Sequence, residues 1–324
     1  MTLDSIALVF GSAALGLAPL ICFFFQIVYP KAQLLIVAIS AAFFFLLASL
    51  VSGLIWYILD PVIGLESGWS AIFPGVICQF LFRVAFVRVY HKVEQTIEQS
   101  MAVSEETNGD ASQLSAARLK LELNDVASGL AAGIGFGGMH AILFFGSLLA
   151  SESATIGVLY QPSCPSVPTL AVSSINAFCF FFLDLAWMLF TFFGVRRRVI
   201  FPRGGGSLND LNPRHRQYGS FFGNTRMGGN MSLLTVLVSH FFAAGFTTFN
   251  VYNYGCNFSL PLLAATTICV CALFMSGVSK IYRPLPYSNT RLSLPASFSY
   301  VSKNDGENED GHDVVEQNRS TEEK

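Results

Sequence analysis

Seven long apolar stretches, separated by polar or proline-containing segments, follow one another along the chain. Each is about as long as the ~20 apolar residues that cross the hydrocarbon of a bilayer as a helix. A chain in lipid must satisfy its backbone polar groups within each segment, so every stretch predicts a transmembrane helix. The predicted helices cover residues 5–28, 32–59, 67–89, 125–150, 168–193, 231–251 and 260–279.

The predicted fold is therefore an all-α polytopic membrane protein, with a seven-transmembrane helix bundle over residues 1–287. Two polar cytosolic loops, 90–124 and 194–230, connect its helices. The first loop keeps helical spacing at both ends, around a polar centre. The tail, residues 288–324, is polar throughout and predicts a disordered cytosolic segment.

Composition supports a bilayer as the main solvent of this chain. Hydrophobic residues make up 52% of the sequence and charged residues only 12%, whereas soluble domains carry about a quarter charged residues. The mean hydropathy is +0.53. We expect lipid to cover most of the surface, and we expect no nucleic-acid partner.

The distribution of Lys and Arg predicts the orientation. Of the 19 basic residues, only Arg83 lies well within a predicted helix. Arg88 lies at the end of the third predicted helix, and this end and all the other basic residues fall in segments that one orientation places inside. Cytosolic loops carry the excess of Lys and Arg in membrane proteins. The N-terminus is therefore predicted to be outside and the C-terminus cytosolic.

Two cysteines and one sequon fall in segments predicted to be outside. Cys164 and Cys256 lie in separate loops, where the oxidising compartment permits a disulfide, although the sequence does not decide whether the loops meet. Asn257 begins an Asn-Phe-Ser sequon and is a candidate for glycosylation close to the membrane. The other five cysteines lie within predicted helices and are interpreted as small apolar packing residues.

The fourth predicted helix carries glycine at every fourth position, namely Gly129, Gly133 and Gly137. Glycine costs roughly 0.5–1 kcal/mol against alanine in a helix interior. In lipid, small residues on one face let two helix backbones come close and associate by van der Waals contact. The stripe has two interpretations: it packs against a neighbour in the same bundle, or it forms a groove for a helix of another subunit.

Polar residues at similar depth are the second signal inside the helices. Arg83, Asp184 and His240 lie roughly 9–14 Å from the cytosolic helix ends at 1.5 Å rise per residue, with Gln79 one turn from Arg83. A charge at this depth costs about 2.5–3.5 kcal/mol or more unless it is paired. We predict an Arg83–Asp184 ion pair with His240 nearby. In the alternative, Arg83 extends to the cytosolic surface and Asp184 is neutral.

No catalytic constellation is expected. An aspartyl protease needs two carboxylates that share a proton, and Asp184 is the only carboxylate well inside a predicted helix. The zinc-protease motif HExxH and a GxSG motif with a partner histidine do not occur. His140 is expected in the outer half of the fourth helix, away from the polar cluster, as a hydrogen-bonded packing residue. We expect no cofactor and no metal.

Four segments together resemble the anterior-pharynx-defective-1 family: ASGLAAGIGFG, VSHFFAAGFTTFN, AAFFFLLASLVSGLIWYIL and CQFLFRVAFVRVYHK. The resemblance implies a seven-helix, non-catalytic scaffold subunit of γ-secretase, the intramembrane aspartyl protease complex. It implies that the chain binds nicastrin and holds presenilin together with the presenilin-enhancer protein. The complex would cut type I membrane proteins such as Notch and the amyloid precursor protein, and would reside in the endoplasmic reticulum, Golgi and plasma membrane.

The resemblance also implies roles for single residues, and the chain departs from the family at two of them. The glycine stripe and His240 match the family's assembly glycines and its sixth-helix histidine. The fifth helix of the family usually carries a second histidine, where this chain has Asp184. The third helix usually has Gln-Glu followed by Arg, where this chain has Gln79, Phe80 and Arg83. We hypothesise that the carboxylate missing at Phe80 reappears at Asp184.

Two other classes share the predicted topology. A seven-helix receptor would need an acidic-Arg-Tyr run at the inner end of the third helix, where this chain reads VRVYH, and an Asn-Pro motif in the seventh. A small-solute transporter could use the cluster of Arg83, Asp184 and His240 as a pathway, although transporters more often show internal repeats or broken helices.

Overall fold

The described part of the computed structural model has seven helices that are long and apolar enough to cross a membrane, as the hydrophobic pattern predicts. The structure describes residues 3–63, 69–107, 125–153, 158–201, 222–223 and 225–279. The predicted tail, residues 108–124 of the first predicted loop, and residues 202–221 and 224 of the second lie outside these residues. The spans are α1 (Leu3–Phe23) with the π-helical turn η1 (Phe24–Val28), α2 (Ala32–Ile63), α3 (Trp69–Thr107), α5 (Asp125–Ala141) with η2 (Ile142–Gly146) and α6 (Ser147–Ser153), α7 (Thr169–Ile200), α9 (Arg226–Thr247) with η4 (Thr248–Val251), and α10 (Cys256–Ser279).

Two helices extend further at their inner ends than predicted. Helix α3 continues from the predicted end at Val89 to Thr107, and α7 continues from Phe193 to Ile200. The α3 extension contains neither Gly nor Pro, and the α7 extension contains no Pro and a single glycine, Gly194, which a helix tolerates. The predicted ends followed the loss of apolar residues, but a helix backbone continues into water when no breaker stops it.

The last two spans begin earlier than predicted. Helix α9 begins at Arg226 rather than Met231, because Thr225 caps it and its side chain accepts a hydrogen bond from the backbone N–H of Gly228 at 3.0 Å. Helix α10 begins at Cys256, about one turn before its predicted start.

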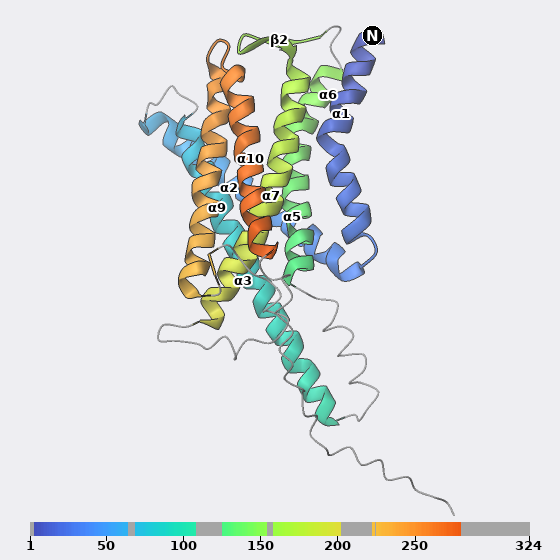
Figure 1. The fold of residues 1–324 in the computed structure, drawn as a ribbon, viewed down its shortest axis with the longest axis vertical. Helices are drawn as coiled ribbons and strands as arrows, with labels where there is room; N and C mark the ends of the chain where they lie inside the picture. Colours follow the sequence, from blue (N-terminus) through green and yellow to red (C-terminus); the bar gives the residue numbers. More distant parts are fainter. Residues whose placement is uncertain are drawn as a thin grey trace, which may run out of the picture. The chain divides into compact units, whose positions relative to one another are not determined.

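Helix α7 forms the centre of the bundle. In an apolar 18-residue stretch of α7, 89% of the residues are buried, against 11% in the corresponding stretch of α1 and 28% in that of α10. It contacts α1, α3, α5, α9 and α10, and Figure 1 shows α5 and α10 running alongside it. Since lipid can cover the outer faces of the peripheral helices, only a central helix must match its neighbours on every side.

Helix α5 approaches two further helices through glycines outside the predicted stripe. A Cβ at Gly135 would overlap the carbonyl oxygen of Ala38 in α2, and a Cβ at Gly138 would come within 2.5 Å of the Leu20 side chain in α1. Glycine on several faces of α5 therefore permits close packing on α1 and α2 as well as on α7.

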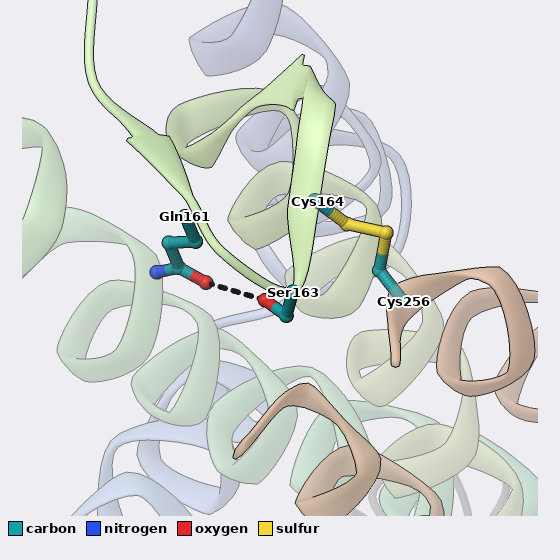
Figure 2. The surroundings of a disulfide bond; sticks show 4 residues. All are labelled: Gln161, Ser163, Cys164 and Cys256. Atoms are coloured by element: carbon teal, nitrogen blue, oxygen red, sulfur yellow. Dashed lines mark hydrogen bonds between the residues drawn. A yellow bond between two sulfur atoms is a disulfide. The ribbon is translucent and has the colours of Figure 1, made fainter. Parts of the chain in front are cut away.

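A short hairpin precedes α7 at the end of the bundle predicted to be outside. Its strands, β1 (Tyr160–Gln161) and β2 (Cys164–Pro168), pair antiparallel, and the Ser163 hydroxyl donates to Gln161 Oε1 at 3.4 Å. A disulfide between Cys164 and Cys256 joins this hairpin to the start of α10 (Figure 2). The sequence did not decide whether these two loops meet. In the structure they do, and the bond joins the hairpin before α7 to the first residue of α10.

Candidate functional site

A charged cluster lies inside the bundle, where α3, α5, α7 and α9 meet. Arg83 of α3 forms an ion pair with Asp184 of α7, and both side chains are 0% exposed. The guanidinium group also donates to Gln79 Oε1 at 3.4 Å and lies 3.2 Å from Nδ1 of His240 in α9. The four predicted cluster residues are thus together, drawn from three helices.

Arg83 does not extend to the surface. Its guanidinium carbon lies 4.8 Å from the ring centre of Phe136 and 5.0 Å from that of Trp187, so aromatic faces surround the charge. The Trp187 ring also packs on His240 with centroids 4.3 Å apart. The alternative in which Arg83 reaches the cytosolic surface is wrong for this structure.

His140 belongs to the cluster, and the expectation that it lies apart is wrong. Its Nδ1 atom is 2.8 Å from Oδ2 of Asp184. Its ring lies beside Phe45 and Phe180, with centroid distances of 5.1 and 4.9 Å. The depth of Asp184 was counted from the predicted helix end at Phe193, whereas α7 continues to Ile200. Asp184 therefore lies deeper than expected, at the level of His140. A signal was present: His140 follows Gly137 by three residues and so lies beside the glycine stripe.

The cluster borders a cavity of about 360 Å³. Gln79, His140 and His240 line it, together with Phe180 of α7 and small residues of α3 and α9. The polar edge of the cluster is therefore accessible from a cavity, although the Arg83–Asp184 pair itself is buried.

The glycine stripe faces α7 of the same chain. A Cβ at Gly129 would lie 3.0 Å from Leu189, and a Cβ at Gly133 would lie 2.8 Å from the backbone Cα of Leu185. A Cβ at Gly137 would lie 3.1 Å from Asp184 Cβ. The stripe is thus filled by a neighbour within the bundle, and the interpretation as an open groove for another subunit is wrong.

A second ion-pair network, missed in the sequence, lies at the inner end of the bundle. Arg196 of α7 contacts Glu94 of α3 at 2.6 Å and Asp125 of α5 at 2.5 Å. The sequence contains a feature that could have predicted this network: a carboxylate begins one apolar stretch and a run of arginines follows the end of another. His91, Glu94 and Asp125 are close enough to share a metal ion. Because the Arg196 guanidinium already binds the carboxylates of Glu94 and Asp125, the geometry favours an ion-pair network over a metal site.

Asn257 is exposed in the first turn of α10, next to the disulfide. The hydroxyl-bearing residue of its sequon, Ser259, is 0% exposed. Glycosylation at Asn257 stays a prediction, and in the folded helix the asparagine is accessible but the Ser259 hydroxyl is not.

The cluster does not form the dyad of an aspartyl protease. Asp184 bonds to Arg83 and to His140, and no other carboxylate contacts it within the part of the chain that the structure describes. An aspartyl protease needs two carboxylates that share one proton. A carboxylate held between a guanidinium and an imidazole is suited to joining helices.

Comparison with known protein families shows which family this bundle matches. A family model described as Aph-1 protein matches residues 7–279, a range that includes every residue of the cluster and both disulfide cysteines. Comparison with curated proteins gave no match. The family match therefore rests on the membrane bundle and not on the C-terminal tail.

Proposed function

Since the chain belongs to the Aph-1 family and is thus a γ-secretase subunit, we propose that it is the non-catalytic scaffold of that intramembrane protease. In this role it binds nicastrin and holds presenilin together with the presenilin-enhancer protein. It supports cleavage of type I membrane proteins such as Notch and the amyloid precursor protein, in the endoplasmic reticulum, Golgi and plasma membrane.

The observation that carries the non-catalytic role is the Arg83–Asp184 pair. Asp184 is held by a guanidinium group and by His140, so its charge is already used to join α3, α5 and α7. Breaking a buried pair is strongly unfavourable because it leaves an uncompensated charge. A carboxylate in this position is expected to maintain one arrangement of helices on which partners can assemble.

The peripheral helices support binding of other membrane subunits. Large apolar side chains such as Phe10 of α1, Leu50 of α2 and Ile268 of α10 are exposed in the isolated chain. In a bilayer such faces contact lipid or the helices of partners. Because α7 is enclosed by its own neighbours, partners are expected to bind the outer helices.

The test is expression of the tagged full-length chain in cells that lack their own scaffold subunit, followed by purification in mild detergent. Quantitative mass spectrometry should recover nicastrin, presenilin and the enhancer protein in stoichiometric amounts, and cleavage of a type I substrate should be restored. Arg83→Leu should abolish both, while Arg88→Leu, on the exposed face of the same helix, should not.

Two outcomes would replace the proposal. Recovery of the chain alone, with no cleavage restored, would favour a transporter that uses the cluster of Arg83, Asp184 and His240. Recovery with a G protein that depends on added ligand would favour a seven-helix receptor.

A further inference from the structure

The contact between Arg83 and His240 determines where His240 carries its proton. A guanidinium group has five N–H donors and no acceptor. Its Nη1 atom lies 3.2 Å from Nδ1 of His240, so this Nδ1 must supply the lone pair. A neutral His240 therefore carries its proton on Nε2.

The contact between His140 and Asp184 requires the opposite arrangement. Asp184 is ionised beside Arg83 and can only accept hydrogen bonds. Its Oδ2 atom lies 2.8 Å from Nδ1 of His140, so this Nδ1 must carry a proton and donate. In a neutral ring the lone pair of His140 is then on Nε2.

Charge balance favours the neutral form of both rings. The charges of Arg83 and Asp184 cancel, and both side chains are fully buried. A protonated imidazole would add an uncompensated charge at membrane depth, which is costly in hydrocarbon. Neutral rings of opposite tautomer satisfy all the contacts without a net charge.

We propose that His140 and His240 hold opposite tautomers, and that His140 is the positioning residue that fixes the Asp184 carboxylate toward Arg83. Arg83 occupies one carboxylate oxygen and His140 the other. Without His140, the second oxygen would lose its donor and the carboxylate could rotate away from the guanidinium. His140 thus acts on Arg83 only through its contact with Asp184.

The same assignment determines the state of the Nε2 atom in both rings. Both histidines line the cavity of about 360 Å³, and neither Nε2 atom has a hydrogen-bond partner among the described residues. With the proposed tautomers, His140 keeps a lone pair on Nε2 and His240 keeps an N–H on Nε2.

Solid-state NMR of the full-length chain in lipid nanodiscs, labelled with ¹³C and ¹⁵N at histidine, tests the tautomers. The chain has five histidines, and the signals of the two residues are assigned by their loss in His140→Asn and His240→Asn. We expect protonated Nδ1 in His140 and protonated Nε2 in His240. In Asp184→Leu the His140 ring loses its acceptor, so its ¹⁵N signals should change.

Conservative variants test the positioning role. In His140→Asn the side-chain amide can donate from about the place of Nδ1, whereas in His140→Gln the amide lies one bond farther out. Thermal unfolding in detergent should show a stability near wild type for His140→Asn and a clear loss for His140→Gln and His140→Leu.

Two results would overturn the proposal. The same tautomer in both rings, or an imidazolium in either, would exclude the tautomer assignment. Equal stability of the Asn, Gln and Leu variants would exclude the positioning role. The NMR measurement uses the unmodified side chains, so it decides the tautomers even if a variant does not fold. Neither measurement depends on the assembly or the activity of γ-secretase.

Discussion

Gly137 of α5 and Asp184 of α7 lie so close that a Cβ on the glycine would be 3.1 Å from the Cβ of the aspartate. The glycine stripe and the charged cluster are therefore parts of one contact. Close approach of the two helix backbones puts Asp184 within reach of His140, which follows Gly137 on α5 by three residues. A change that separates α5 from α7 should weaken the polar contact as well as the packing.

Substitution within the stripe should destabilise the bundle. In Gly133→Ala the new Cβ would meet backbone of Leu185 at 2.8 Å, and overpacking costs about 1–3 kcal/mol. The control is Gly53→Ala in α2, where nothing lies within 4 Å of the new Cβ and helix propensity improves by up to ~1 kcal/mol. Thermal unfolding should show a lower midpoint for the first variant only. Equal midpoints would mean that α5 and α7 do not pack as described.

Removal of either partner of the central ion pair should be costly. Arg83→Leu and Asp184→Asn should each destabilise by about 3–5 kcal/mol, because one buried group loses its partner. The double variant with leucine at both positions should lose less than the sum of the single variants. If Asp184→Asn leaves assembly and stability unchanged while Arg83→Leu abolishes them, the two residues do not act as a pair.

Moving the carboxylate back to α3 should partly compensate for its loss from α7. Phe80 is partly buried against the core, and it lies three residues before Arg83 on the same helix, within reach of a side-chain pair. Phe80→Glu combined with Asp184→Asn should therefore be more stable and assemble better than Asp184→Asn alone. This comparison is made by thermal unfolding and co-purification, and an additive loss would contradict the hypothesis that the carboxylate has changed helix.

Loss of the disulfide should destabilise the outer end of the bundle. Cys164 and Cys256 are 92 residues apart in the sequence, and closing a loop of this size contributes up to about 4–5 kcal/mol in the chain-entropy description. Since the bilayer already restricts the unfolded chain, the double Cys→Ser variant should lose less than this. A maleimide gel shift before and after reduction reports whether the thiols are bonded. Labelling of both cysteines without reductant would exclude the bond.

The inner network offers a matched pair of arginines. Arg196→Leu removes the partner of Glu94 and Asp125. Loss of one partner of a fully buried pair costs about 3–5 kcal/mol. Since Glu94 is 17% exposed, we expect a smaller loss of stability than this. Arg198→Leu changes an exposed residue two positions further on and should have little effect on unfolding. If both variants unfold at the same midpoint, Arg196 does not join α3, α5 and α7.

The hydrophobic pattern determined the number and approximate limits of the membrane spans, because the cost of placing a segment in lipid depends on its own side chains. It misjudged the inner ends of α3 and α7, which continue as helices beyond their apolar residues. The pairing of Arg83 with Asp184 was also predictable, since a charge at that depth requires a partner and few candidates existed.

Only the tertiary structure decided which helix fills the glycine stripe and that His140 contacts Asp184. Both depend on how far each helix is rotated about its axis and at what height it crosses its neighbour. These quantities are set by the fit of side chains across several helices at once, so no single segment of the sequence contains them.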